Sequence, residues 1–417
     1  MWESLRTAFR IPDIRKKMWW TVFLLAVFRL GSYIVVPGMN PYNFGENNIF
    51  NLLDMFSGGA LSNMSVFALG VQPYITSSII MNLLTMVIPG WQELSKEGPE
   101  GRRVLARYTK YGTVILGLLQ AFAITMGFRG AMVDPTSVTS LITIVLTMTA
   151  GTVFLTWLGE HISERGIGNG VSMLIFAGIV ARFVPDAIRT VQTVGEGGIS
   201  PIGLIFFLIL TVLIVAFVVV VTQGERKIPV QYAKRVVGRK MYGGQATHMP
   251  LRVNQVGVIP VIFASSVLAF PMTIAGFLSP ESGFYRFVQK FFYPGQPIYL
   301  VIYAAFIFLF SYFYTAVTFN PVEVADNLKK YGGFIPGIRP GRPTAEYLDR
   351  ILTRITTAGA LFLTFVALLP YLLGPLTGIR QIGFGGTSLL IAVGVAIDTM
   401  KQIEAQLVMR QYEGFLK

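Results

Sequence analysis

Apolar runs about as long as a bilayer is thick recur along almost the whole of this sequence. A helix needs roughly 20 apolar residues to cross the hydrocarbon core of a membrane. With 53% hydrophobic and 13% charged residues, the 417-residue chain is also too apolar for a soluble protein of its size. We therefore predict an all-α polytopic membrane protein with ten transmembrane helices. The predicted spans are residues 18–36, 64–89, 111–128, 138–158, 170–184, 202–222, 255–278, 298–319, 355–374 and 386–399.

The basic residues are distributed unevenly between the loops on the two sides of these spans. When alternate loops are assigned to opposite sides, about 27 Lys and Arg fall on the side of the N-terminus and about 6 on the other. Because cytoplasmic loops carry the excess of Lys and Arg, we expect both termini in the cytoplasm. This asymmetry accounts for most of the net charge of +13 without a polyanionic ligand.

Two predicted cytoplasmic loops, 224–254 and 320–354, are longer than the topology requires. Each mixes basic residues with Tyr, Gly and Pro, which suits either a docking surface or an ordinary solvated loop. The loop 38–63 is assigned to the other side of the membrane, and its second half belongs to the sequence "FNLLDMFSGGALSNMS". That segment is too short to span and too apolar to lie free in water, so we predict a short re-entrant helix folded into the protein.

An internal repeat relates the two halves of the chain. The pattern G-x-S-x-L-I-x-x-G begins at Gly170 in the fifth predicted helix and again at Gly386 in the tenth. "QPYITSSII" in the second helix and "IPVIFASSV" in the seventh each place a Pro mid-helix, followed by an Ile and a Ser pair. These pairs predict two five-helix halves, 1–190 and 191–417. Because five is odd, the second half is inverted, and a central pathway runs between the matched helices.

The residues near the matched helices are aliphatic or neutral polar. No Asp or Glu lies in the middle of any span, whereas ion-coupled carriers usually need carboxylates there. The repeat instead aligns Ile75 with Ile262 and Ile175 with Ile391, which form either a hydrophobic constriction or ordinary core. Hydropathy alone also permits a ten-helix inverted-repeat secondary transporter, and this alternative stays open at this point.

The sequence offers no catalytic or metal-binding constellation. There is no Cys, and of the two His residues His161 stands beside Glu160 and Glu164 without a coordinating cluster. "GIGNG" follows no strand and precedes no G-K-[ST], so we interpret it as the entry to the fifth helix. We predict that the protein is not an enzyme and binds no metal and no cofactor.

Seven long runs occur in the order typical of one known family. Their presence from near the N-terminus to about residue 405 shows that the chain resembles the SecY family, whose members form the central subunit of the bacterial protein-conducting channel. The runs are "FRLGSYIVVPG", "MFSGGALSNMSVFALGVQPYITSSII", "ERGIGNGVSMLIFAGIV", "YAKRVVGR", "NQVGVIPVIFASSVLAFP", "FNPVEVADNLKKYGGFIPGIRPG" and "GGTSLLIAVGVAID".

The resemblance implies four groups of functional residues in an hourglass pore with a re-entrant plug, near 54–65, and a lateral gate toward lipid. The pore ring is expected at Val71, Ile75, Val171, Ile175, Ile262 and Ile391. The plug residues are Asp54, Phe56, Ser57, Gly58, Gly59, Ala60, Leu61 and Ser65. The gate residues are Gln72, Thr76, Ser77, Asn82, Asn254, Ser265 and Ser266. The docking residues for a motor or ribosome are Arg235, Arg239, Lys240, Arg339 and Arg342.

The resemblance also implies a function, its partners and a location. The expected function is translocation of unfolded secretory polypeptides across the bacterial plasma membrane and lateral release of transmembrane segments into it. The expected partners are small membrane subunits resembling SecE and SecG, the ATPase motor SecA, a translating ribosome, signal sequences, nascent polypeptides and membrane lipids.

Overall fold

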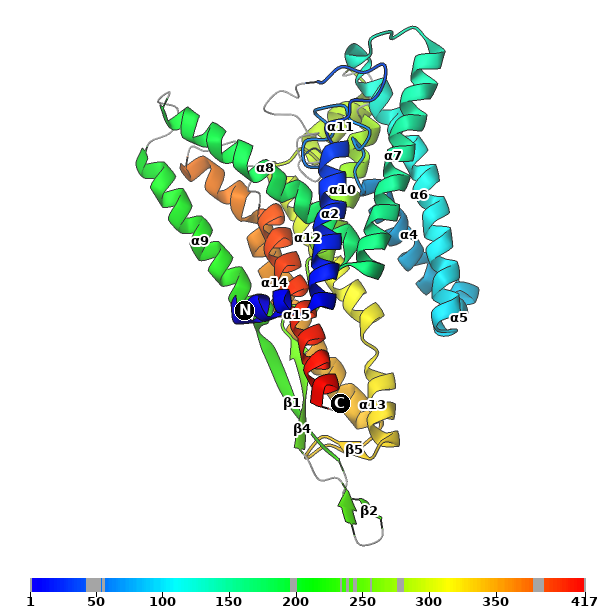
Figure 1. Ribbon diagram of the computed structural model, residues 1–417, viewed down its shortest axis with the longest axis vertical. Helices are drawn as coiled ribbons and strands as arrows, with labels where there is room; N and C mark the ends of the chain where they lie inside the picture. Colours follow the sequence, from blue (N-terminus) through cyan, green and yellow to red (C-terminus); the bar gives the residue numbers. More distant parts are fainter. Residues whose placement is uncertain are drawn as a thin grey trace.

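The computed structural model describes residues 2–42, 54, 57–195, 201–232, 235–237, 240–242, 246–255, 257–275, 281–377 and 386–415. It is a bundle of helices from one end of which a β-hairpin projects (Figure 1). The start of α1 and the end of α15, which carry the two chain termini, lie toward the hairpin end of the molecule (Figure 1). The helices are α1 (Trp2–Arg10), α2 (Pro12–Gly31), α4 (Gln72–Val87), α5 (Pro89–Lys96), α6 (Pro99–Gly127), η1 (Arg129–Ala131), α7 (Val138–Arg165), α8 (Gly170–Gly195), α9 (Pro201–Gln223), α10 (Ile259–Ala275), α11 (Gly283–Phe291), α12 (Pro297–Thr318), α13 (Pro321–Lys330), α14 (Arg342–Thr377) and α15 (Gly386–Phe415).

Each of the ten predicted spans overlaps a helix, namely α2, α4, α6 to α10, α12, α14 and α15. Among the described residues, four helical segments are long and apolar enough to cross a membrane, and the number rises to five when α4 and α5, which are bent by 102°, are counted as one span. Three shorter apolar helices lie at Gly170–Phe183, Leu208–Gln223 and Ile259–Met272. The first and third of these belong to the fifth and seventh predicted spans. Short apolar helices are typical of the centre of a membrane protein rather than of its lipid-facing rim.

The prediction that the two matched prolines lie mid-helix is wrong. Pro73 stands in the first turn of α4, and Pro260 in the first turn of α10. Proline lacks an N–H, and the first turn is the one place in a helix where that N–H has no intrahelical partner. The helix of the second span therefore begins at Gln72, and residues 66–71 form successive turns before it.

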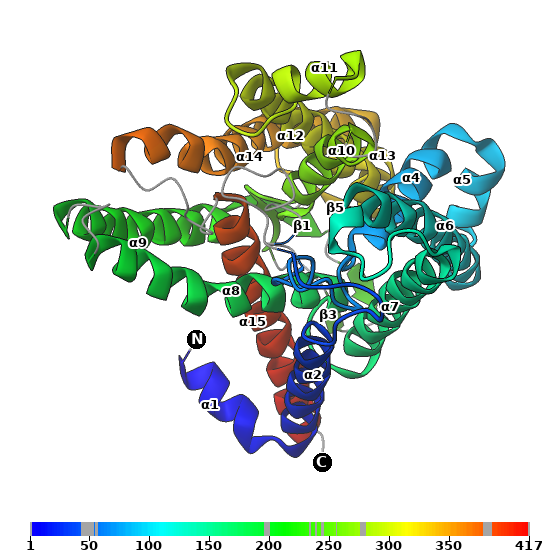
Figure 2. The same ribbon diagram turned by 90° about the horizontal axis from the view of Figure 1, so that it is seen from above.

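Helices that are equivalent in the internal repeat contact each other in space. Helix α4 packs against α10, and α8 packs against α15. The remaining helices of each half lie on either side of these two pairs, with α2, α6 and α7 on one side and α9, α12 and α14 on the other (Figure 2). The four helices that carry the repeat therefore lie at the interface between the two halves of the chain.

The loop predicted as a docking surface at 224–254 contains strands that the sequence did not reveal. β1 (Glu225–Tyr232) pairs antiparallel with β4 (Ala246–Arg252) and with β5 (Gly333–Phe334), while β2 (Arg235–Val237) pairs with β3 (Lys240–Tyr242). Ile228 and Leu251 are each 1% exposed and join α14 residues in a small separate core. The hairpin is therefore fixed at its base to the helical body.

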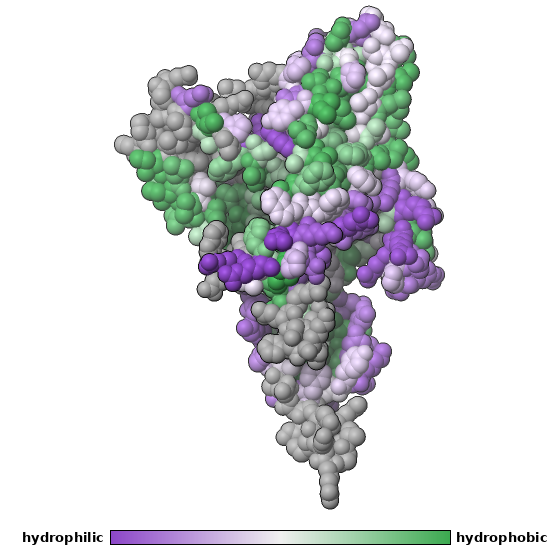
Figure 3. Space-filling model, viewed as in Figure 1, coloured by the Kyte–Doolittle hydropathy of each residue, from purple (hydrophilic) through white to green (hydrophobic). Residues whose placement is uncertain are grey.

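The surface of the helical body is apolar over a broad zone. Figure 3 shows hydrophobic side chains across the upper part of the molecule and a hydrophilic band below it, around α1 and α5. Large apolar side chains are exposed on several helices, for example Leu119 on α6, Val220 on α9 and Val301 on α12, each more than 60% exposed. A continuous apolar surface of this kind requires lipid around it, so this is a membrane protein.

We predict that Gly170→Ala destabilises the protein. A Cβ at Gly170 would overlap the carbonyl oxygen of Gly159 and lie 2.6 Å from its carbonyl carbon, so α7 and α8 would have to separate. Overpacking of this kind costs about 1–3 kcal/mol. Thermal unfolding in detergent should show a lower midpoint, whereas Gly90→Ala, with no atom within 4 Å of the added Cβ, should leave it unchanged. Equal midpoints for the two variants would contradict the close approach.

Candidate functional site

A small cavity lies at the junction of α4, α6, α8 and α10. Its volume is about 40 Å³, which is room for a few water molecules but not for a polypeptide. The residues predicted from the sequence supply much of its wall. The ring residues on the wall are Val71, Ile75, Ile175 and Ile262, the gate residues are Gln72, Thr76, Ser265 and Ser266, and the plug residues are Ser57 and Leu61.

All six predicted ring residues lie in one hydrophobic cluster contributed by both halves of the chain. Ile391 on α15 is fully buried in that cluster but does not line the cavity. Val171, at the start of α8, is partly buried and packs toward Gly159 of α7. The structure therefore brings the six residues together, with four of them at the cavity and two behind it.

The hydroxyl groups of three gate residues are satisfied within their own helices. Thr76 donates to the carbonyl oxygen of Gln72 at 3.1 Å on α4. Ser265 and Ser266 on α10 both donate to the carbonyl oxygen of Ile262, at 2.9 and 2.8 Å. Separating α4 from α10 therefore leaves none of these three donors unpaired, although buried donors without partners are costly.

The other predicted gate residues lie away from this cavity. Ser77 is buried and donates to the carbonyl oxygen of Thr109 at 2.7 Å, so it joins α4 to α6. Asn82 is not among the residues that line the cavity. Asn254 lines a second, smaller cavity against α12 and α14. Four of the predicted gate residues therefore line the cavity at the seam of α4 and α10, and the other three do not.

The described plug residues form turns held by backbone hydrogen bonds. Asp54 is helical, Ser57 to Ser65 are in turns and a bridge, and Phe56 lies outside the described residues. The N–H of Gly59 donates to the carbonyl oxygen of Asp54 at 2.9 Å, and the N–H of Ser65 donates to that of Ala60 at 2.9 Å. The segment is also tied to the end of α2 by a bridge between Val35 and Ser65.

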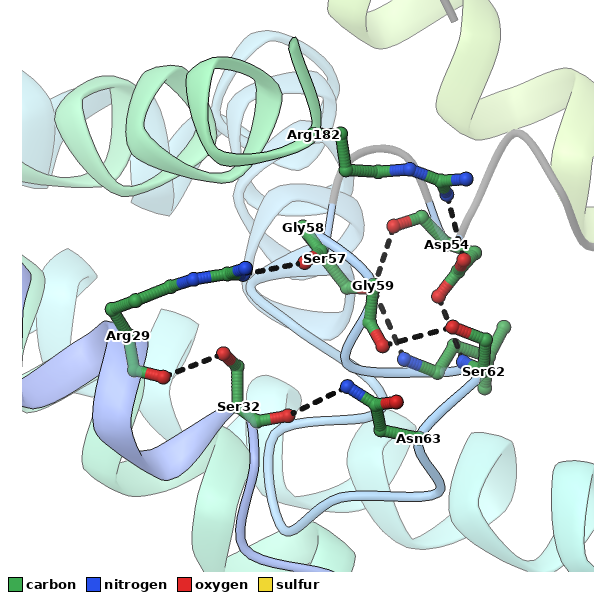
Figure 4. A network of polar contacts seen from close by, with 10 residues as sticks. Arg29, Ser32, Asp54, Ser57, Gly58, Gly59, Ser62, Asn63 and Arg182 are labelled. Atoms are coloured by element: carbon green, nitrogen blue, oxygen red, sulfur yellow. Dashed lines mark hydrogen bonds and ion pairs between the residues drawn. The ribbon is translucent and has the colours of Figure 1, made fainter. Parts of the chain in front are cut away.

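Two arginines hold the plug from different helices, as Figure 4 shows. Arg182 of α8 forms an ion pair with Asp54 at 2.6 Å, and the Asp54 side chain is only 3% exposed. The other carboxylate oxygen of Asp54 accepts the N–H of Ser62 at 2.8 Å. Arg29 of α2 donates to the carbonyl oxygen of Gly58 at 2.8 Å and stacks over Tyr33. Arg29, a charged residue within the first predicted span, therefore faces protein and provides a hydrogen-bond donor for a backbone carbonyl group of the plug.

A glycine pair brings the plug into backbone contact with α8. Gly58 has φ +69°, and a Cβ on it would lie 2.8 Å from the Cα of Gly178. Gly178 is the last glycine of the repeat pattern. Its counterpart Gly394 lies against Val258 at the entry to α10, where an added Cβ would lie 2.6 Å from a methyl carbon. The repeat glycines therefore mark two places where other chain segments press against the central helices.

Four of the five predicted docking residues are described, and they lie in or next to β2, β3 and the start of α14, at the hairpin end of the molecule (Figure 1). Arg339 lies just before α14 and Arg342 is its first residue; both are exposed, and Arg342 pairs with Glu346 at 3.1 Å. The backbones of Arg235 and Lys240 belong to the paired strands β2 and β3, and Arg239 lies outside the described residues.

Sequence reasoning missed two polar residues at this site, besides several apolar residues of the cavity wall. Gln120 of α6 lines the cavity as an isolated polar residue in an apolar run, which could have marked it. Arg182 pairs with an acidic residue 128 positions away, and the only available signal was a charge at the end of the fifth span.

Comparisons of the sequence with a family model and with known proteins all identify the same family. A family model described as SecY matches residues 65–400. The chain is 48% identical to the protein translocase subunit SecY of Halalkalibacterium halodurans, with 100% of both chains covered. It is 44% identical to the protein translocase subunit SecY of Escherichia coli K12, covering 98% of this chain and 95% of that protein.

Solved structures share the fold at low sequence identity. A structure described as that of a protein conducting channel has a TM-score of 0.71 at 20% identity, with 97% of each chain covered. One concerning the SecY plug domain, which stabilises the closed state of the translocation channel, has a TM-score of 0.68 at 21% identity and the same coverage. Sec61 in the canine ribosome-channel complex has a TM-score of 0.67 at 19% identity, again with 97% of each chain covered.

We predict that Arg182→Gln loosens the plug. Hydrogen bonds to charged groups contribute about 1.5–3 kcal/mol, so losing the pair should speed local opening tenfold or more. Amide hydrogen exchange at Ser62 and Gly59 measures this. Arg103→Gln removes a pair whose two side chains are 76% and 79% exposed, and it should leave the exchange unchanged. Unchanged exchange in Arg182→Gln would show that the ion pair does not hold the plug.

Proposed function

This chain belongs to the SecY family, and from that premise we propose that it forms the channel of a protein translocase. It passes unfolded secretory polypeptides across the membrane and releases transmembrane segments sideways into lipid. The supporting observation is that aliphatic residues from α4, α8, α10 and α15 cluster around a cavity that the plug helps to line.

In this proposal the cluster acts as the pore ring and the plug seals it. A constriction lined by Ile and Val resists water and ions because wetting it is unfavourable. A cavity of about 40 Å³ between ring and plug corresponds to the idle, closed channel. The SecY plug domain of the structure with TM-score 0.68 is described as maintaining a membrane seal, and we assign the same task to the segment from Asp54 to Ser65.

The seam between α4 and α10 serves as the lateral gate, with α6 and α12 beside it. Helices α4 and α10 contact each other, and Ile75 and Ile262 both line the cavity at their seam. A signal sequence inserts there and the plug moves aside. An apolar segment leaves toward lipid because each buried CH₂ contributes about 0.8 kcal/mol. This process makes and breaks no covalent bond, so the chain acts without being an enzyme, and its partners supply the energy.

We assign the chain to the bacterial plasma membrane, with both termini in the cytoplasm. The excess of basic residues on one side of the predicted spans supports this orientation. The two halves, 1–190 and 191–417, form the two sides of the channel, as the contacts between repeat-equivalent helices suggest. Small subunits resembling SecE and SecG complete the channel in the membrane.

The hairpin end of the molecule is the proposed docking surface for a SecA-like ATPase or a translating ribosome. Two structural relatives are described in complexes with ribosomes. The exposed Arg339 and Arg342 and the strand residues Arg235 and Lys240 supply positive charge there, and the sequence adds Arg239 between the two strands. A basic docking surface suits acidic side chains of a motor or the phosphates of ribosomal RNA.

We predict that changing Ile75, Ile262 and Ile391 together to Gly makes the channel leak ions, because the ring loses the side chains that keep it dry. Conductance of the reconstituted protein in planar bilayers is the measurement. The matched control changes Ile115, Ile142 and Ile205 to Gly, since these side chains are each more than 50% exposed on the outer surface. Similar conductance in both triple variants would refute the ring.

We predict that Arg339→Glu reduces motor-driven translocation of a secretory protein into vesicles by at least tenfold, because losing one partner of an interfacial charge pair costs about 2–5 kcal/mol. The idle leak should stay low, since Arg339 lies outside the ring cluster. Arg103→Glu, at an arginine that is also exposed but lies on α6, should translocate normally. Normal translocation by Arg339→Glu would remove this residue from the docking surface.

A further inference from the structure

Helix α11, which sequence reasoning did not predict, lies on the rim of the molecule. It follows α10 after a short connection and precedes α12, and in Figure 2 it lies at the outer edge beside both. It is at the end of the bundle opposite the hairpin (Figure 1). Because α10 and α12 correspond to consecutive spans, a helix between them lies at the level of a membrane surface.

The surface of α11 is divided into three sectors. Val288 is 1% exposed, and together with Tyr285 it packs into the same core that contains the ring residues. Phe284 and Phe287 are 42% and 50% exposed on a neighbouring face. Arg286, Gln289 and Lys290 occupy the remaining face and are exposed.

The aromatic residues are packed into one group. The ring of Phe287 lies 4.8 Å from that of Phe291 and 6.3 Å from that of Phe292, and Phe292 packs against the core. The amine of Lys290 lies 5.7 Å from the centre of the Phe291 ring. A large apolar side next to cationic side chains is the arrangement of helices that lie in the interface plane of a bilayer.

We propose that α11 is an interfacial anchor that inserts Phe284 and Phe287 among the acyl chains of the outer leaflet. Arg286 and Lys290 then lie at the height of the lipid phosphates and favour anionic phospholipids. Charge complementarity and the lipid-facing spans on either side identify phospholipid as the occupant of this face. Since α11 packs against α10, the anchor ties the outer end of one side of the gate seam to the surrounding lipid.

The absence of Cys from the chain makes a direct test possible. Phe287→Cys is labelled with an environment-sensitive fluorophore, and the full-length protein is reconstituted into vesicles of phosphatidylethanolamine and phosphatidylglycerol. A spin label on a lipid acyl chain near the headgroup should quench this probe severalfold more than aqueous iodide does. Gln289→Cys, two residues along on the water-facing side, is the matched control and should show the reverse preference.

The charges are tested with spin-labelled phosphatidylglycerol and phosphatidylcholine. The probe at position 287 should be quenched roughly fivefold better by the anionic lipid, a preference expected from basic residues near a membrane surface. Arg286→Gln with Lys290→Gln should abolish that preference. The proposal fails if the probes at 287 and 289 are quenched alike, if the probe at 287 is shielded from both quenchers as a protein contact would shield it, or if the anionic preference survives the double substitution.

Discussion

Backbone polar groups inside a bilayer must find partners within the protein, and this constraint acts most strongly on the turns between Ser57 and Val71. Turn hydrogen bonds within the segment satisfy part of this backbone, and the remaining groups need partners from elsewhere in the protein. Strand-like contacts with the segment that follows α2 supply some, since the N–H of Val66 donates to Ile34 and the N–H of Val36 donates to Met64. The carboxylate of Asp54 and the guanidinium of Arg29 supply others. The plug is therefore attached to α2 and α8 together, and its displacement disturbs both.

The positions of the membrane helices could be predicted because lipid thickness fixes the length of an apolar run. The exact beginnings of helices could not, since Pro73 is compatible with a kink inside a helix as well as with its first turn. The hairpin of β1 and β4 was also hidden. Its buried residues, Ile228 and Leu251, alternate with polar ones for too short a distance to stand out from a basic loop.

The candidate site was predictable only where the internal repeat of the sequence marked its residues. The repeat identified four isoleucines far apart in sequence, and the structure places them in one cluster. Ser77 was assigned to the gate by its neighbours in the chain, yet it faces α6. The side of a helix on which a serine lies depends on which helix packs there, and that information is tertiary. The pairing of Asp54 with Arg182 depends in the same way on how α8 crosses the plug.

The self-contained hydroxyls of Thr76, Ser265 and Ser266 have a consequence for substrate choice. If α4 and α10 were joined by polar bonds, opening would face a fixed threshold that every substrate had to overcome. Because these hydroxyls bond within their own helices, a segment entering the proposed gate meets the aliphatic side chains of Ile75 and Ile262 and replaces their contacts in proportion to its own apolar area. We expect a gate built this way to measure hydrophobicity on a continuous scale, so that small differences in signal sequences translate into graded efficiencies of entry.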